Sequence, residues 1–595
     1  MFDKVLIANR GEIAVRIVRA LREMGVASVA VYSDSDREAL HTTLADEAYH
    51  VGPTPAAESY LDIDKLLAVA RRSGAQAVHP GYGFLAESAP FARAVAEAGL
   101  TWVGPHPEAI DSMGSKVESR RIMSAAGVPT IPGTADPAET SKEVIAFGEE
   151  HGYPVAVKAS AGGGGKGFAV ANDASEAEAA FERASREGEA YFGDGAVYIE
   201  RYLPSPRHIE IQVMRDKHGN AAHLGERDCS IQRRHQKLLE ECPSPALTPE
   251  MRAEMGRAAV EAAEAVEYDS VGTVEFLLQK GEAGDEFFFL EMNTRVQVEH
   301  PVTEEVTGVD IVETGLRIAA GEPLPFTQDE VVHRGHAIEV RLNAEDAAAG
   351  FIPSPGPVTV YEEPSGPGVR VDSSLRSGIP GEVAESYDPL FAKLIVRGAD
   401  RAGALGRLRR AIAEFRVEGI STTLPFFTAL LDDEMFVSGE YTTRYVEERM
   451  EHLSLAAPAA AGHAAPEGTE KPEKSVREVE AEVNGRLFKV KLYAEDFGGS
   501  GGGGQAAGPP RRRGSGGGSG RSAASEGAIV APMQGTILRV LVEVGQEISA
   551  DEPVCVLEAM KMESEVRATR EGTVSAVNVA AGQTVASGEP LVVLE

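Results

Sequence analysis

The chain has 595 residues, 43% hydrophobic and 25% charged, and its 58 Lys and Arg stand against 92 Asp and Glu, a formal net charge of −34. At roughly 100–200 residues per domain, this length predicts about three to five domains and excludes a single small binding module. The acidic balance argues against general affinity for nucleic acid or an anionic membrane, because the field repels polyanions. Any phosphate ligand must therefore be held by local basic groups.

The cysteines and the N-terminus bear on the compartment. The three cysteines, Cys229, Cys242 and Cys555, are too few and too scattered for a disulfide framework or a cysteine-based zinc site. The N-terminal apolar run of about four residues is well short of a signal peptide or a membrane span. These features predict a cytoplasmic protein that is neither exported nor inserted in a membrane.

Alternating strands and amphipathic helices open the chain. A strand from Lys4 to Ala8 is followed by a helix from Arg10 to Met24 and a strand from Ala27 to Tyr32, and the pattern then repeats as far as Ala77-Val78-His79. This alternation predicts an α/β domain with a parallel sheet over residues 1–110. The first turn lacks the Gly-x-Gly-x-x-Gly fingerprint, which argues against NAD binding.

A glycine run from Gly162 to Gly167 separates two predicted strands, Tyr153 to Ser160 and Phe168 to Ala171. It is not a Walker P-loop, because Gly167 and a strand stand where that motif needs Ser or Thr and a helix. Glycine still lets backbone amides approach a polyanion closely. By itself, the run is a weak indication of a phosphate-binding loop.

Two carboxylates in apolar strands give a stronger indication. Glu275 lies within Thr273 to Leu278, and Glu291 ends Phe287 to Glu291. A carboxylate there is costly unless a cation compensates it, and carboxylate oxygens suit Mg²⁺ bound together with substrate phosphates.

Beyond Glu291, polar residues continue at every second position, namely Asn293, Arg295, Gln297 and Glu299. Side chains alternate along an extended segment, so these groups are predicted to project to the same side. A solvated strand edge is the alternative, but it does not explain why the series continues directly from an apolar strand.

Low-complexity sequence rich in Ala, Pro, Gly and Ser follows over residues 453–526, where we expect a flexible linker. Within it, a short β-hairpin over 478–493 is predicted around Asn484-Gly485. A lone hairpin is marginal in water, so we expect it to dock on another surface.

The last segment contains an internal repeat. Gly535 to Glu558 and Gly572 to Glu595 align without gaps at an offset of 37, with eleven identities in 24 positions. Two Val-rich copies punctuated by Gly and Pro predict a two-fold pseudosymmetric β-sandwich. The join presents Lys561 between two methionines. An ordinary surface lysine is one interpretation, but exposed methionines at a turn favour a lysine that carries a covalent prosthetic group.

Five longer motifs resemble the biotin carboxylase family of ATP-grasp enzymes. They are Ile7 to Ile13, His79 to Leu85, Glu226 to Ser230, Gln232 to Lys237 and Glu291 to His300. Ala559 to Met562 likewise resembles the signature of a biotinyl domain, whereas lipoyl domains generally lack the flanking methionines. Together these segments resemble the α subunit of bacterial acetyl-/propionyl-CoA carboxylases.

The resemblance implies a multidomain α/β fold. It consists of an N-terminal α/β domain over 1–113, an ATP-grasp domain over 114–320, a C-terminal α+β domain over 333–450, and an all-β biotinyl barrel-sandwich over 527–595. The expected cofactors are biotin on Lys561 and Mg²⁺ or Mn²⁺, with ATP as a substrate.

The resemblance also implies the roles of individual residues. Metal ions would be held by Glu275, Glu291 and Asn293. ATP would be contacted by Lys116, Lys158, Gly163, Gly164, Gly165, Lys166, Gly167, Glu200, Leu203, His208, Gln232, Lys237 and Leu277. Bicarbonate would be bound by Lys237, Arg295, Gln297, Val298 and Glu299.

Four of the implied residues, Lys237, Arg295, Glu299 and Arg341, would be catalytic. Glu299 would be the general base that takes the bicarbonate proton, kept ionised by a neighbouring arginine. Arg341 would stabilise the biotin anion, because a fixed guanidinium suits developing negative charge. Three other polar residues in motif-like surroundings, Glu87, Asp388 and Lys393, are expected to be structural.

The expected activity is ATP- and bicarbonate-dependent carboxylation of biotin, which a separate carboxyltransferase β subunit would use to carboxylate acetyl-CoA or propionyl-CoA. Partners would therefore be that subunit, in a hetero-oligomer, and biotin protein ligase. Methylcrotonyl-CoA or pyruvate could be the acceptor instead. A carbamoyl-phosphate type of ligase and a non-catalytic biotinylated scaffold are the rival functions; Lys561 with the repeat argues against the first, and the Glu275, Glu291 and Glu299 set argues against the second.

Overall fold

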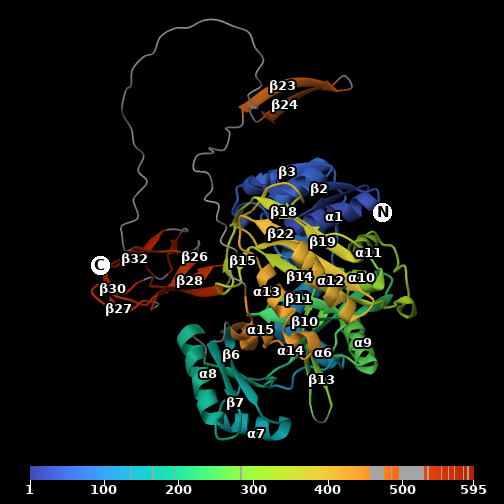
Figure 1. Ribbon diagram of the computed structural model, residues 1–595. Helices are drawn as coiled ribbons and strands as arrows, with labels where there is room; N and C mark the ends of the chain where they lie inside the picture. Colours follow the sequence, from blue (N-terminus) through green and yellow to red (C-terminus); the bar gives the residue numbers. More distant parts are fainter. Residues whose placement is uncertain are drawn as a thin grey trace, which may run out of the picture. The chain divides into compact units, whose positions relative to one another are not determined.

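The computed structural model describes residues 1–455 except 135, 164–165, 193–194 and 282–283, then 475–483, 486–494, and 528–594 except 532–534, 551, 560–561, 569, 581 and 586–588. The chain divides into two compact units, Met1–Thr469 and Glu470–Glu595 (Figure 1). Within the described residues, no helix combines the length and the hydropathy needed to cross a membrane.

The N-terminal part is built on a five-stranded parallel sheet, as predicted, in the order β3-β2-β1-β4-β5. Its elements are β1 (Lys4–Ile7), α1 (Gly11–Glu23), β2 (Ala27–Ser33), α2 (Leu40–Leu44), β3 (Glu47–Gly52), α3 (Ile63–Ser73), β4 (Ala77–His79), α4 (Ala89–Glu97) and β5 (Thr101–Trp102). Helix α1 buries Ile13, Ile17 and Leu21 at a spacing of four residues, which places one face against the core.

A small antiparallel sheet in the order β7-β6-β8 carries the glycine run. The elements of this region are α5 (Pro107–Gly114), α6 (Lys116–Ala125), α7 (Ser141–His151), β6 (Val155–Gly163), β7 (Lys166–Ala171), α8 (Ala177–Phe192) and β8 (Val197–Arg201). The two strands predicted around the run are therefore confirmed, and their own core includes Val155, Val157 and Ile199.

An antiparallel sheet of eight strands is the largest sheet of the first unit, in the order β13-β12-β9-β10-β11-β14-β21-β19. Its strands are β9 (Arg207–Arg215), β10 (Ala221–Arg233), β11 (Gln236–Cys242), β12 (Val271–Gln279), β13 (Glu286–Asn293), β14 (His336–Asn343), β19 (Val369–Ser373) and β21 (Leu390–Gly398). The pairing of β11 with β14 makes the sheet continuous between the segments expected to be the ATP-grasp and C-terminal domains.

Helices and short strands complete this unit. They are α9 (Pro249–Ala265), α10 (His300–Thr307), α11 (Ile311–Ala319), β15 (Glu345–Asp346), β16 (Ile352–Pro353), β17 (Gly356–Val358), β18 (Val360–Glu362), β20 (Gly381–Val383), α12 (Arg401–Glu414), β22 (Arg416–Glu418), α13 (Leu424–Leu430), α14 (Glu434–Ser438) and α15 (Tyr445–Arg449).

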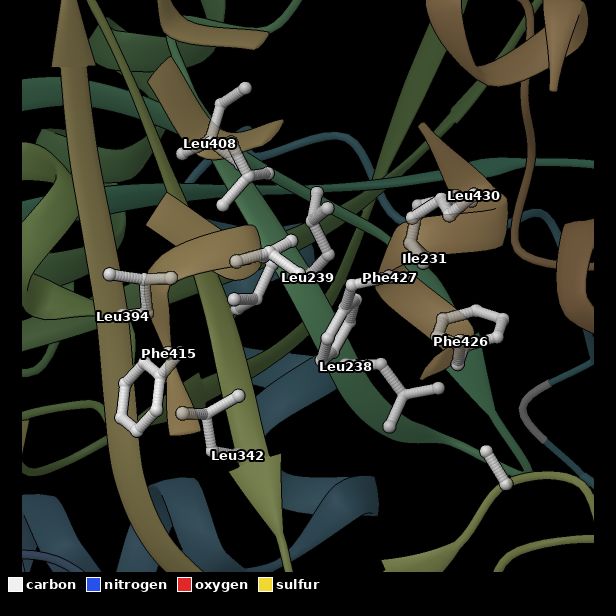
Figure 2. Packing of buried hydrophobic residues seen from close by; sticks show 14 of the residues in the cluster. Ile231, Leu238, Leu239, Leu342, Leu394, Leu408, Phe415, Phe426, Phe427 and Leu430 are labelled. Atoms are coloured by element: carbon white, nitrogen blue, oxygen red, sulfur yellow. The ribbon is translucent and has the colours of Figure 1, made fainter. Parts of the chain in front are cut away.

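The core beside the sheet fixes which way its strands face. Leu342 and Leu394, from β14 and β21, pack in one cluster with Phe415, Phe426 and Leu430 (Figure 2). Burying each such side chain contributes about 1.5–3 kcal/mol. Because side chains alternate along a strand, fixing the face of Val340 and Leu342 places Glu339 and Arg341 on the opposite face.

The second unit contains the predicted hairpin and the predicted repeat. Strands β23 (Ser475–Val483) and β24 (Arg486–Ala494) pair antiparallel, whereas Asn484 and Gly485 lie outside the described residues. The remaining strands are β25 (Ala528–Val530), β26 (Gly535–Val540), β27 (Glu547–Ile548), β28 (Pro553–Ala559), β29 (Met562–Arg567), β30 (Gly572–Val577), β31 (Thr584–Val585) and β32 (Pro590–Leu594).

The repeat forms two four-stranded sheets, β25-β32-β30-β27 and β29-β28-β26-β31. Shifting β26, β27 and β28 by 37 residues gives the starts of β30, β31 and β32, so each sheet exchanges equivalent strands with the other. The pseudosymmetric sandwich is therefore confirmed. Ala559 pairs with Met562 in the β28–β29 hairpin, and Lys561 lies outside the described residues.

Candidate active site

A partly buried lysine gathers carboxylates from three different parts of the chain. Lys237 on β11 places Nζ at 2.6 Å from Glu210 Oε2 of β9, 2.8 Å from Glu275 Oε1 of β12 and 2.7 Å from Glu299 Oε1. Burial alone would lower the pKa of Lys237, but the three carboxylates outweigh it and raise that pKa well above its usual value. Lys237 is therefore a fixed cation.

Glu299 is held between two cations. Besides Lys237, it meets Arg341 of β14, whose Nη2 donates to Glu299 Oε2 at 3.0 Å. The carboxylate is fully buried, which by itself would raise its pKa, yet Lys237 and Arg341 hold that pKa well below the usual range. Glu299 is thus an ionised carboxylate in a site from which water is largely excluded.

Arg341 is oriented from its other side by Glu240 of β11, whose Oε1 accepts from Arg341 Nε at 2.7 Å. Burial would lower the pKa of Arg341, but Glu240 and Glu299 raise it. Next to Glu240 across the ladder stands Glu339, which is fully buried with neither carboxylate oxygen hydrogen-bonded. Burial raises the pKa of Glu339 well above its usual value, which favours the neutral acid.

Glu275 and Glu291 face each other across the β12–β13 ladder. Glu275 accepts from Asn293 Nδ2 at 3.0 Å and lies 2.9 Å from His208 Nε2, so although burial would raise its pKa, Lys237 and His208 lower it. For Glu291, burial and then the charge of Glu275 raise the pKa. Two hard oxygen donors side by side, one destabilised as an ion, fit a divalent cation.

Arg295 is fixed by three side-chain acceptors. Its Nη1 donates to Gln297 Oε1 at 3.1 Å, its Nη2 to Asn293 Oδ1 at 3.0 Å, and its Nε to Glu87 Oε2 at 3.0 Å. The predicted neighbourhood of Asn293, Arg295 and Gln297 is therefore confirmed. Glu87, expected to be structural, holds Arg295 from the N-terminal part.

The extended path predicted as far as Glu299 is wrong at its end. Strand β13 stops at Asn293, and Glu299 is the residue that precedes α10. Pro301 stands in the first turn of α10, where proline favours helix initiation. Glu299 thus enters the site from a helix start, and Lys237 and Arg341 hold it there.

The expected nucleotide residues fall into two groups. Lys158 Nζ contacts Glu200 Oε1, and Arg120 Nη1 lies 3.4 Å from Glu200 Oε2, on the small sheet. His208 Nδ1 lies 3.3 Å from Gln232 Nε2, near Glu275 on the large sheet.

The other expected nucleotide residues are less informative. Lys116 begins α6 and is exposed, Leu203 is buried, and Leu277 lies on β12. Gly163 and Lys166 pair across β6 and β7, and the amide of Gly167 donates to Glu187 Oε2 at 3.0 Å. Gly164 and Gly165 lie outside the described residues.

Sequence reasoning missed several residues of the site, notably Glu210, Arg227, Glu240 and Arg120. Glu210 lies in β9 and contacts both Lys237 and Arg227. Strand β9 also contains Arg207, His208, Gln212 and Arg215, so the carboxylate of Glu210 does not stand out in an apolar run as that of Glu275 does.

Family comparisons agree with this architecture. Residues 1–110 match the biotin carboxylase N-terminal domain, 115–327 the carbamoyl-phosphate synthase L chain ATP-binding domain, 339–448 the biotin carboxylase C-terminal domain, and 527–594 the biotin-requiring enzyme family.

Relatives of known activity span nearly the whole chain. The biotin-dependent acyl-coenzyme A carboxylase alpha3 subunit of Mycobacterium leprae is 46% identical over 573 residues, which cover 95% of this chain and 94% of that protein. The propionyl-CoA carboxylase alpha chain of Ruegeria pomeroyi is 41% identical over 659 residues, which cover 96% of each.

Among solved structures, the biotin carboxylase domain of the 2-oxoglutarate carboxylase of Hydrogenobacter thermophilus, in complex with MgADP, ADP and bicarbonate, is 46% identical. Its TM-score is 0.68, and the match covers 77% of this chain and 100% of that one. The chain described here therefore belongs to the biotin carboxylase family and carries a biotinyl-type domain at its C-terminal end.

Proposed function

We propose that this chain uses ATP and bicarbonate to carboxylate the biotin held on its own Lys561. The carboxybiotin is then supplied to a separate carboxyltransferase β subunit that acts on acetyl-CoA or propionyl-CoA. The observation that carries this proposal is the geometry of Glu299: an ionised, fully buried carboxylate held at 2.7 Å from Lys237 and 3.0 Å from Arg341.

Glu299 is the general base. It takes the bicarbonate proton, and the freed oxygen attacks the γ-phosphorus of ATP while the β–γ bridging P–O bond breaks and ADP leaves. Arg295 and Lys237 neutralise the bicarbonate, with Gln297 and the backbone of Val298 beside them. The product, carboxyphosphate, breaks down to CO₂ and phosphate close to Arg341. That phosphate takes the N1 proton of biotin, the rigid guanidinium of Arg341 stabilises the resulting oxyanion, and N1 then attacks CO₂ to form the new N–C bond.

Glu275, Glu291 and Asn293 are the residues that would hold Mg²⁺ or Mn²⁺, which would neutralise the negative charge of the ATP phosphates during transfer. Lys116, Lys158, Glu200, Leu203, His208, Gln232 and Leu277 would contact the nucleotide, together with the glycine loop from Gly163 to Gly167. The related domain solved with MgADP and bicarbonate supports this assignment of ligands.

Biotin protein ligase would attach biotin to Lys561, and the low-complexity stretch over 453–526 would let the carrier travel. The relatives that match the whole chain are acyl-CoA carboxylase α subunits, which supports a β subunit as partner and an acyl-CoA as acceptor.

Radiolabelled bicarbonate tests this function. The purified chain with Mg²⁺ and ATP should release ADP faster when free biotin is added and should acquire acid-labile label on the protein; Lys561→Arg should keep the first property and lose the second. Adding a β subunit with acetyl-CoA, propionyl-CoA, methylcrotonyl-CoA or pyruvate then identifies the acceptor. Absence of bicarbonate-dependent ADP release from the wild type would refute the proposal.

A further inference from the structure

A second lysine, Lys393, contacts the backbone of the segment from Arg295 to Glu299, which is proposed to bind bicarbonate. Lys393 on β21 has no exposed side-chain surface, and its Nζ donates to the backbone carbonyl of Val298 at 2.7 Å. The same Nζ lies 3.2 Å from Glu12 Oε1 of α1, which is 2% exposed. A charged donor makes a hydrogen bond about twice as strong as a neutral one.

This contact belongs to a chain of groups from three elements. Glu12 Oε1 also accepts from the hydroxyl of Tyr82, in the segment after β4, while Glu12 Oε2 has no hydrogen bond. Asp372 and Glu339 are the other carboxylates whose charge bears on Lys393. Tyr82, Glu12 of α1 and Lys393 of β21 thus form one chain of contacts, and Lys393 is the member that reaches the carbonyl oxygen of Val298.

That carbonyl lies in the same peptide plane as the amide of Glu299, because the peptide unit is planar. Fixing the oxygen of Val298 fixes the direction in which the chain enters Glu299 and α10. The carboxylate end of Glu299 is held separately by Lys237 and Arg341. The general base is therefore held at both ends, and Lys393 supplies the backbone end.

We propose that Lys393 is a positioning residue that sets the Val298–Glu299 peptide for bicarbonate binding and deprotonation, a role that rests on the proposed function of Glu299. Lys393 is not among the residues proposed to contact ATP or bicarbonate. Its removal should therefore affect the bicarbonate step and leave nucleotide binding unchanged.

Four variants of the full chain test this role. Lys393→Met keeps the length of the side chain but leaves Glu12 unpaired, so Glu12→Gln/Lys393→Met removes both charges and protects the fold. Glu12→Gln alone keeps the donor to Val298. Lys217→Met is the matched control, because Lys217 Nζ donates to the carbonyl of Ala319 at 2.9 Å in another part of the unit.

In free-biotin assays, we expect Lys393→Met and the double variant to lower kcat/KM for bicarbonate by about tenfold to a hundredfold, mainly through a higher KM for bicarbonate. The KM for ATP should stay unchanged. Glu12→Gln and Lys217→Met should retain wild-type values. Equal changes in both KM values, no change in a folded double variant, or a double variant that does not fold would each overturn the positioning role. A wild-type chain inactive with bicarbonate would instead refute the proposed function itself.

Discussion

Glu299→Gln is the substitution that tests the general base most directly. It keeps the shape of the side chain and removes its ability to accept a proton. Loss of a positioned base costs about 100-fold to 10,000-fold in rate, so we expect kcat for bicarbonate-dependent ATP cleavage to fall within that range. ATP affinity should stay unchanged, because the expected nucleotide residues do not include Glu299.

The structure also sets the stability cost of this change. Removing one member of a buried ion pair typically costs about 3–5 kcal/mol. Here Lys237 keeps Glu210 and Glu275 as acceptors, and Arg341 keeps Glu240. Both cations remain compensated, so we expect a smaller cost of about 1–3 kcal/mol, comparable to hydrogen bonds to charged groups.

The pH dependence of this contribution has a definite sign. Lys237 and Arg341 lower the pKa of Glu299 in the folded state, so its stabilisation is complete above the unfolded value of about 4.3 and is lost as pH falls below it. Denaturant unfolding at pH 7 and at acidic pH should therefore show the difference between wild type and Glu299→Gln shrinking as the solution is acidified.

Glu241→Gln is the matched control. Glu241 is also fully buried on β11, where it pairs with the Arg401 guanidinium at 2.7 Å and lies 2.6 Å from His336 Nε2, but it lies outside the site. It should lose stability and keep kcat. If Glu299→Gln keeps near-wild-type activity, or if Glu241→Gln loses as much activity, the assignment of Glu299 as the base is wrong.

Four other substitutions have defined outcomes. Glu291→Gln should raise the Mg²⁺ concentration for half-maximal activity by about tenfold to a hundredfold, and an unchanged requirement in a Mg²⁺ titration would refute the metal assignment. Because burial raises the pKa of Glu339, the unfolded chain loses this proton above about pH 4.5 while the folded chain retains it, so Glu339→Gln should flatten the fall in stability above that pH and leave kcat intact. Glu240→Gln should lower kcat instead, and equal losses of kcat in the two variants would contradict this distinction. Lys561→Arg should abolish avidin binding on a blot, and a signal equal to wild type would place the biotin elsewhere.

Much of the fold and part of the site were predictable because they depend on local periodicity. The offset of 37 residues in the repeat reappears as equivalent strands in two equivalent sheets. Glu275 and Glu291 were found because each is a charge in an apolar strand, and the structure places them opposite each other. Period-two alternation likewise predicted that Asn293, Arg295 and Gln297 lie together.

The rest depends on which strands become neighbours. Lys237 meets Glu210 and Glu275 only because β9 lies between β12 and β10, an order that no local pattern in one sequence reveals. Glu240 and Arg341 meet because β11 pairs with β14, nearly a hundred residues later in the chain. The alternation of polar residues predicts an extended segment as far as Glu299. Pro301, in the first turn of α10, is the residue in the sequence that indicates a helix start there instead.

The charges of the site sharpen the meaning of the net charge of −34. The sequence suggested that cations would be confined to the site to receive anionic substrates. In the described part of the chain, however, three of these cations are already engaged by carboxylates: Lys237 by Glu210, Glu275 and Glu299, Arg341 by Glu240 and Glu299, and Arg295 by Glu87. Glu291 adds a further carboxylate beside them. Phosphates approaching this cluster meet no surplus of fixed positive charge, so a divalent cation must supply it, and the carboxylates that make the cluster unfavourable for bare ATP are the ones that favour the metal-bound nucleotide.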